Sequence, residues 1–293
     1  MSGRVAAGLA GGAVGALARR ALDAVVPPGH ERWTRTNHRG EPISLLEGPA
    51  VAAGLAAAAV ACGGRVGAAG AVAVAGGAAF GLVDDLSEDA GRVRKGLRGH
   101  LGALATGELT TGGLKVLGIG ATSLVAAAVA LGPLSGGSRP GAPTGARALV
   151  GRLGDVALGG ALIAGTANLV NLLDLRPGRA LKAAGIAAIP LVAHPVAGPL
   201  AAGVVGTGAS ALPGDLGEVD MLGDSGANAL GALVGTAAVV AAPRPLRAAL
   251  LAGVVALTVA SERVSFTEVI ARTPALRAID EWGRRHRPPD RSR

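Results

Sequence analysis

Long apolar runs dominate the chain, and short charged segments separate them. The runs are mostly 15–22 residues of Ala, Gly, Val and Leu. A helix needs about 20 mainly apolar residues to cross the ~30 Å hydrocarbon core of a bilayer. No run keeps the period of two that a strand requires, and open sheets cannot span lipid. The pattern therefore predicts nine membrane-spanning helices, at residues 4–26, 48–63, 66–83, 113–133, 148–170, 183–196, 198–213, 226–242 and 245–260.

The composition supports a membrane protein and excludes other classes. Half of the 293 residues are hydrophobic and 16% are charged, whereas a soluble domain carries about 25% charged residues. Disordered chains are polar and rich in charge, and the 49 glycines follow no Gly-X-Y period. The single cysteine, Cys62, cannot form an internal disulfide. We therefore expect an all-α, polytopic membrane helix bundle, with a transmembrane domain over 1–262 and a basic cytoplasmic tail over 263–293.

The positions of the basic residues predict the orientation. With the N-terminus outside and the C-terminus inside, the inner segments hold 20 of the 28 Lys and Arg residues, and the outer segments hold seven. Positive residues retained in the cytoplasm set orientation, so this distribution favours the arrangement. We expect a multi-pass protein of the bacterial inner (plasma) membrane in contact with membrane lipids. No basic stripe with interleaved aromatic residues is present, so nucleic acid is not an expected partner.

Three other features bear on the ends, a loop and assembly. Residues 1–20 fit a cleaved signal peptide loosely, but cleavage would leave Arg19 and Arg20 outside, which favours an uncleaved span. The Gly/Pro/Ser-rich stretch 132–145 is expected to be a flexible outer loop. The arginine-rich tail is expected to bind anionic headgroups or to be a solvated end. Gly8, Gly12 and Ala16 form a small-x-x-x-small pattern that permits close helix pairing, including a homodimer.

The first acidic motif is the pair Asp84 and Asp85, where the third span leaves the membrane. Carboxylates this close raise each other's pKa unless they share a cation. Mg²⁺, which binds a few carboxylates together with phosphate oxygens, is one such cation. One carboxylate could instead serve as a general base, and a solvated acidic loop is the alternative. Arg94 and Lys95 follow on a basic stretch.

The second motif consists of Asn168, Asn171 and Asp174. Their spacing of three and three places them on one face at the cytoplasmic end of the fifth predicted span. Polar residues at membrane depth usually face the bundle interior or a water-filled cavity and mark function. Hydrogen bonding between helices by the two asparagines is the alternative.

The third motif contains Asp220, Asp224 and Ser225, where the chain enters the eighth predicted span. Asp224 or Ser225 could simply cap that helix, although a helix N-terminus also provides amides for an anion or a metal-phosphate group. The span assignment places all three motifs at the cytoplasmic ends of different spans. We therefore expect these carboxylate and amide groups to meet at one membrane face.

Five short segments, in the same order along the chain, resemble a known family. They are 37–42 (NHRGEP), 81–85 (GLVDD), 168–174 (NLVNLLD), 221–226 (MLGDSG) and 261–265 (SERVS). They are similar to five segments of the polyprenyl-phosphate N-acetylhexosamine-1-phosphate transferases. In the same order, these are the loop after the first span, the aspartate pair, the Asn-x-x-Asn-x-x-Asp segment, the Met-Gly-Asp-x-Gly-Ser segment with one insertion, and the Glu-x-x-Ser segment. This family includes phospho-N-acetylmuramoyl-pentapeptide transferase and GlcNAc-1-phosphate transferases.

The resemblance implies a Mg²⁺-dependent transfer of a sugar-1-phosphate from a UDP-sugar to a polyprenyl phosphate, with release of UMP. Asp84 and Asp85 are then candidates for activating the lipid phosphate, and Asn171 and Asp174 for holding the nucleotide diphosphate. We add Arg94 and Lys95 as phosphate contacts. The candidate residues are Asp84, Asp85 and Asp174 for catalysis, Asn168, Asn171, Arg94 and Lys95 for substrate binding, and Asp224 and Asp85 for Mg²⁺.

The chain also departs from the family's pattern. Pro177 stands where the family has a second aspartate that is associated with the nucleoside. His286 is the only histidine where the pentapeptide transferases carry a histidine cluster, and the segment from Ser44 to Gly48 lacks the usual Thr-Pro-Thr-Met-Gly-Gly. A MurNAc-pentapeptide substrate is therefore not expected.

Three hypotheses follow, in decreasing order of support. The first is a divergent polyprenyl-phosphate sugar-1-phosphate transferase that binds Mg²⁺, the lipid phosphate and a nucleotide-sugar donor. The second is a catalytically inactive relative that binds lipid phosphate or organises cell-envelope enzymes. The third, a small transporter, would need polar residues at mid-membrane, but Asp23 and His194 both lie near span ends.

Overall fold

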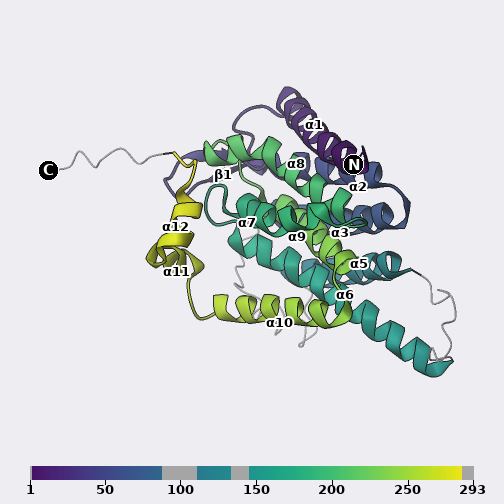
Figure 1. Ribbon diagram of the computed structural model, residues 1–293. Helices are drawn as coiled ribbons and strands as arrows, with labels where there is room; N and C mark the ends of the chain where they lie inside the picture. Colours follow the sequence, from purple (N-terminus) through teal and green to yellow (C-terminus); the bar gives the residue numbers. More distant parts are fainter. Residues whose placement is uncertain (1, 88–110, 133–144, 286–293) are drawn as a thin grey trace.

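Helices make up almost all of the computed structural model, which describes residues 2–87, 111–132 and 145–285 (Figure 1). The expectation of an all-α protein is confirmed for this part of the chain. Its helices are α1 (Ser2–Val25), α2 (Glu47–Cys62), α3 (Gly64–Ser87), α5 (Thr111–Leu131), α6 (Ala146–Leu173), α7 (Arg179–Ala188), α8 (Gly198–Leu216), α9 (Gly223–Ala241), α10 (Arg244–Ser261), α11 (Phe266–Arg272) and α12 (Pro274–Glu281). Short 3₁₀ helices cover Glu31–Trp33 and Ile189–Ala193.

A short antiparallel hairpin interrupts the helical pattern after α1. Strand β1 (Thr34–Thr36) pairs with β2 (Pro42–Ser44), in the register Thr34 opposite Ser44. The hairpin is tied to the loop before α9, because the Ser44 amide donates to the Val219 carbonyl at 2.9 Å and the Met221 amide donates to the Ser44 carbonyl at 2.9 Å. It therefore holds the start of α9 in place.

Within the described part of the chain, five helices are long and apolar enough to cross a membrane. These are the segments Gly3–Val25, Gly64–Ser87, Thr111–Leu131, Ala146–Leu173 and Arg244–Ser261. Large apolar side chains on α1 and α10, among them Leu9, Leu17 and Leu250, are exposed on the outside of the protein. An exposed apolar surface of this kind suits lipid rather than water. The length and composition of the five helices thus indicate a membrane protein.

Two predicted segments are shorter than a typical span. At 183–196 the α-helix ends at Ala188 and continues as the 3₁₀ helix Ile189–Ala193. Pro190 causes the change, because it has no amide hydrogen to donate to the preceding turn. Helix α2 has 16 residues, and a turn at Gly63 and Gly64, with φ of 68° and 57°, separates it from α3. The left-handed backbone at these positions favours glycine.

Helix α9 lies at the centre of the bundle, and the other long helices surround it. Fifteen of its residues, including Leu230, Leu233 and Val239, are buried, and it packs against α2, α3, α6 and α8. Helix α10 is at the other extreme, since none of its residues is buried. It lies along α6 at the edge of the molecule (Figure 1). The polar ends of α3, α5, α6 and α9 meet at one end of this bundle.

The small-residue pattern of α1 is used inside the chain. A Cβ at Gly8 would lie 3.3 Å from the Ala202 carbonyl oxygen, and a Cβ at Gly12 would lie 3.0 Å from that of Gly206. Gly8 and Gly12 therefore pack against α8 of the same molecule. This is the close helix pairing that the small-residue pattern permits, here between α1 and α8.

Candidate functional site

Asp85 fixes the start of α9 from the neighbouring helix α3. Its Oδ1 accepts the Asp224 amide at 2.8 Å, and its Oδ2 accepts the Ser225 amide at 2.9 Å. Gly81 permits this approach, because a Cβ there would collide with the backbone of Asp224 and Ser225. The cap of α9 therefore comes from Asp85, and the alternative that Asp224 or Ser225 caps its own helix is wrong. A carboxylate bound to amides at a helix start is well stabilised.

Lys115, near the start of α5, lies between two carboxylates. Its Nζ donates to Asp84 Oδ2 at 2.9 Å and to Asp224 Oδ2. The carboxyl groups of Asp84 and Asp224 are themselves within hydrogen-bonding reach of each other. The Lys115 side chain is only 16% exposed, so the three groups form a largely water-shielded cluster. Opposite charges at this range in a partly dry site attract each other strongly.

An apolar groove extends from this cluster. It has a volume of about 330 Å³ and is lined by residues of α5, α6, α9 and α10. Lys115, Asn168, Asn228 and Thr258 are its polar residues, and Leu251 and Val255 are among its apolar ones. The Asn228 amide group donates to the Asp224 carbonyl at 2.7 Å, which orients it. A groove with one polar end suits a ligand that has a long apolar chain and a polar head.

A second group of carboxyls lies beside the first. Asp174, the residue after α6, accepts a hydrogen bond from the Gly223 amide. Desolvation and the negative charges of Asp215 and Asp224 raise the pKa of Asp174 well above its usual value. Asp215 follows the predicted span 198–213, and its Oδ1 accepts the Gly178 amide at 3.0 Å. Burial raises the pKa of Asp215 to about 6. Both groups therefore favour their protonated forms more than free carboxyls do.

The C-terminal segment folds onto the same end of the bundle. Arg179 at the start of α7 forms a bidentate pair with Asp280 of α12, with N–O distances of 2.8 and 3.2 Å. Both residues are buried. Lys182 donates to the carbonyls of Ile279, Asp280 and Trp282 and so caps the end of α12. Residues 263–285 of the expected basic tail therefore contain two short helices, of which α12 is fixed to α7 by this pair. Residues 286–293 lie outside the described residues.

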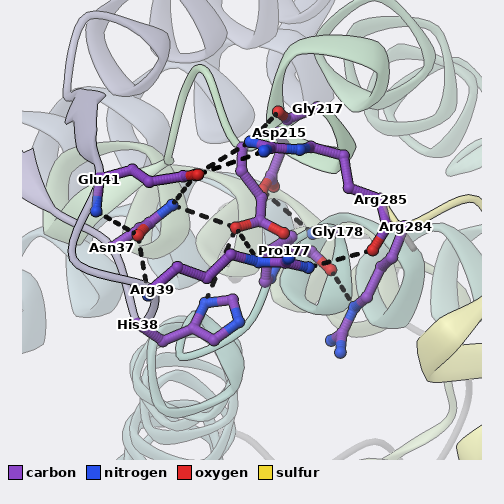
Figure 2. Close-up of polar contacts among 11 residues, drawn as sticks. Asn37, His38, Arg39, Glu41, Pro177, Gly178, Asp215, Gly217, Arg284 and Arg285 are labelled. Carbon is purple, nitrogen blue, oxygen red and sulfur yellow. Dashed lines mark hydrogen bonds and ion pairs between the residues drawn. The ribbon is translucent and has the colours of Figure 1, made fainter. Parts of the chain in front are cut away.

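The turn of the hairpin joins this docked segment (Figure 2). Arg39 donates to the Arg285 carbonyl at 3.0 Å, and Arg285 pairs with Glu41. Arg39 Nε also lies 3.0 Å from Glu218 Oε2. Arg284 donates to the Pro177 carbonyl at 2.9 Å. The position at which the resembling family has its second aspartate is thus covered by an arginine of the C-terminal segment.

The residues present fit only part of the predicted Mg²⁺ site. Among residues 2–87, 111–132 and 145–285, no group of three or more His, Cys, Asp and Glu side chains is arranged to hold a metal ion. Asp85, with both oxygens on α9 amides, is a helix cap in this structure. Asp84 and Asp224 each retain an oxygen besides the one that contacts Lys115. Two carboxylates fit Mg²⁺ when phosphate oxygens and water complete its shell.

The structure thus brings together most of the predicted site residues. Asp84, Asp85, Asp174 and Asp224 meet at one end of the bundle, and Asn168 lines the adjoining groove. The Asn171 side chain makes no hydrogen bond within the part of the chain that the structure describes. The predicted phosphate contacts Arg94 and Lys95, and His286, lie outside the described residues.

Sequence reasoning missed Lys115 and the pair of Arg179 and Asp280. In the sequence Lys115 is a single basic residue at the edge of the predicted span 113–133, far from the acidic motifs along the chain. The Arg179–Asp280 pair joins residues 101 positions apart, and no local pattern indicates it. Such a pair becomes visible only when α12 is placed beside α7.

The chain was also compared with known proteins. No protein-family model matches it, and no curated protein matches it. The chemistry of the site therefore rests on its residues and their geometry.

Proposed function

We propose that this chain is a membrane phosphotransferase that moves a sugar-1-phosphate from a UDP-sugar to a polyprenyl phosphate, initiating a cell-envelope glycan. The observation that carries this proposal is the position of Lys115, between Asp84 and Asp224 and at the polar end of an apolar groove. A polyprenyl phosphate has a long apolar chain and an anionic head. The groove suits the chain, and Lys115 suits the head once Mg²⁺ neutralises the two carboxylates beside it.

The reaction joins two anionic substrates. An oxygen of the lipid phosphate attacks the sugar-bearing phosphorus of the donor, the bond between the donor's two phosphates breaks, and UMP leaves. Lys115 would hold the attacking phosphate, and Asp85 would hold the helix end that carries Asp224. Mg²⁺, bound by Asp224 and Asp84, would supply neutralisation of the diphosphate charge. Positioning and electrostatics provide most of the catalysis in such transfers.

The proposal includes a membrane arrangement. Nine segments cross the bacterial inner membrane, with the N-terminus outside and the carboxylate cluster at the cytoplasmic face. The distribution of Lys and Arg supports this orientation. The segment from Arg179 to Ala193 consists of a ten-residue α-helix and a five-residue 3₁₀ helix. With rises of about 1.5 and 2.0 Å per residue, its length is roughly 25 Å, close to the thickness of the hydrocarbon core.

A second candidate is a catalytically inactive relative that binds lipid phosphate or organises cell-envelope enzymes. Two observations favour it. Pro177 replaces the aspartate that the resembling family associates with the nucleoside, and Lys115 already pairs with both carboxylates that would hold Mg²⁺. This candidate keeps the lipid-phosphate site and lacks the transfer step.

UMP release by the purified full chain separates the candidates. The assay contains Mg²⁺, undecaprenyl or decaprenyl phosphate and a panel of UDP-sugars, and lipid-phosphate binding is measured in parallel. We expect Lys115→Met to lose turnover and to weaken lipid-phosphate binding, because the groove loses its cation. Arg147→Met, which removes an exposed cation at the start of α6, is the matched control and should behave as the wild type.

The outcomes discriminate clearly. Metal-dependent UMP release that Lys115→Met abolishes supports the transferase. Binding of lipid phosphate without UMP release for any donor supports the inactive relative. Lipid-phosphate binding that is equal in the wild type and in Lys115→Met would overturn the central role given to Lys115 in both.

A further inference from the structure

Helix α12 has an apolar side and a polar side. Leu276 and Ile279 lie on one side at a spacing of three, and Trp282 follows directly after the helix in the same phase. All three side chains are exposed, and Trp282 is 67% exposed. Arg277 and Glu281, spaced by four, lie on the other side and are also exposed. A short helix divided in this way suits the boundary between an apolar and an aqueous medium.

The apolar side of α12 borders a groove. The groove has a volume of about 500 Å³ and is lined by residues of α7, of the 3₁₀ helix that follows α7, of α8 and of α12. Ile279 and Trp282 contribute to one wall, and the exposed side chains of Ile186 and Ile189 contribute to another. Lys182 is the one charged residue among the described residues that line it. The volume is typical of a ligand pocket, and the walls suit hydrocarbon.

Lys182 does not offer a free charge to this groove. Its Nζ donates to the carbonyls of Ile279, Asp280 and Trp282, at 3.1, 2.8 and 2.7 Å. These contacts use all three donors of the ammonium group. The same Nζ lies 5.9 Å from the centre of the Trp282 ring, within the range of a cation–π contact. The groove is therefore built for an apolar chain rather than for an anion.

Two connections hold α12 close to the level at which the apolar helices end. Helix α10, which is long and apolar enough to cross a membrane, ends at Ser261, and only α11 separates it from α12. On its other side, α12 is tied to the start of α7 by the buried pair of Arg179 and Asp280, directly before the predicted span 183–196. Figure 1 shows α11 and α12 beyond the end of α10 and running across its direction. This is the position of a helix that lies along a membrane surface.

The exposed apolar surface of α10 continues towards α12. Leu257 and Val259 of α10 are exposed, and so are Val264 and Val269, which lie between the two helices in sequence. Residues 286–293, which follow the C-terminal segment, read HRPPDRSR and include no large apolar side chain that could fill the groove. A contiguous apolar surface of this kind marks contact with another apolar phase or partner. Its continuity with α10 favours lipid.

We propose that α12 is an interfacial helix and that the groove between α7, α8 and α12 holds the upper part of a phospholipid acyl chain. Trp282 then lies at headgroup level, where tryptophan is enriched in membrane proteins. Arg277 and Glu281 remain in water on the other side of the helix. This inference depends on the membrane location of the chain and is independent of the transferase chemistry.

Tryptophan fluorescence in lipid nanodiscs tests the proposal, because Trp33 is the only other tryptophan of the chain. The full-length variant Trp33→Phe keeps Trp282 as the single reporter. Phosphatidylcholine that carries bromine atoms on the upper part of its acyl chains is the quencher. The apolar side of an interfacial helix lies about 5–10 Å into the boundary between headgroups and acyl chains, so we expect bromination to reduce the Trp282 fluorescence about twofold or more. Iodide in the buffer should quench it weakly.

The matched control places the reporter on the other side of the same helix. In a chain with Trp33→Phe and Trp282→Phe, the further substitution Arg277→Trp introduces a tryptophan at an exposed position on the polar side. We expect the opposite result, which is strong quenching by iodide and little quenching by brominated lipid. Glu281→Trp in the same background is a second reporter on that side. Thermal unfolding of each variant identifies any that does not fold.

Each other outcome would overturn the proposal. Quenching of Trp282 by iodide but not by brominated lipid would mean that the groove is open to water. Protection from both quenchers would mean that protein covers the groove, and a dimer in the nanodisc would identify that protein as a second copy. Equal quenching by lipid at positions 277 and 282 would refute the two-sided placement of α12. None of these measurements uses UMP release, so this proposal and the proposed function can fail separately.

Discussion

Asp84 and Asp85 are adjacent and chemically identical, yet their side chains have different partners in the structure. Asp85 accepts two amides of α9, at 2.8 and 2.9 Å, and is 8% exposed. Asp84 contacts Lys115, which also contacts Asp224. Replacing Asp85 by Ala should therefore damage stability, whereas replacing Asp84 by Ala should mainly damage function.

The magnitude follows from the contacts that each variant loses. A hydrogen bond to a charged group contributes about 1.5–3 kcal/mol, so loss of both from Asp85 costs roughly 3 kcal/mol once relief from carboxylate desolvation is included. For a chain of this size that corresponds to a fall in Tm of about 6–12 °C. Asp84→Ala removes one carboxylate from Lys115 but also removes the repulsion between Asp84 and Asp224, so its net cost should be smaller than that of Asp85→Ala. Lys115 also keeps its contact with Asp224.

The assay is thermal unfolding of the full chain in one detergent, with Asp84→Ala as the matched control. Asp85→Asn retains one acceptor and should lie between the wild type and Asp85→Ala. If Asp85→Ala unfolds within about 2 °C of the wild type, or if both alanine variants lose the same stability, the capping role of Asp85 is refuted.

Two more predictions concern pH and the C-terminal segment. The pKa of Asp215 is about 6 in the folded protein and 3.8 for a free aspartate. As the pH rises, the unfolded chain therefore loses this proton at a lower pH than the folded protein does. The contribution of Asp215 to stability is therefore full below about pH 4 and is lost as the pH rises towards 6 and above. Asp215→Asn should increase the free energy of unfolding at pH 7.5 by at most about 3 kcal/mol, which is seen as a higher Tm. It should have no effect at pH 4. Equal shifts at both pH values would contradict this. Arg179→Met should leave the buried Asp280 with Arg284 as its partner, so it should cost less than the roughly 3–5 kcal/mol of a fully broken buried pair, and the double variant with Asp280→Leu should recover part of the loss. Limited proteolysis after residue 262 measures the release, and a wild-type cleavage rate in Arg179→Met would disprove the docking role of the pair.

The sequence alone determined the class of this protein and where its polar chemistry gathers. Apolar runs of membrane length predicted the helices, and every predicted segment from 4–26 to 245–260 overlaps a helix. The alternation of these segments also predicted that Asp84, Asp174 and Asp224 lie at one end of the bundle. Both inferences use only hydropathy and helix geometry, which are local properties of the chain.

Only the tertiary structure decided what each of these polar residues contacts at that end of the bundle. Whether an aspartate caps a helix or faces a ligand depends on which backbone lies opposite it, and the packing of Gly81 on α9 selects Asp85 rather than Asp84 for the cap. Lys115 and Asp280 find their partners 31 and 101 residues away. Charge pairing acts over a few ångströms in space, so residues far apart in sequence acquire these roles only when the helices that carry them are packed together.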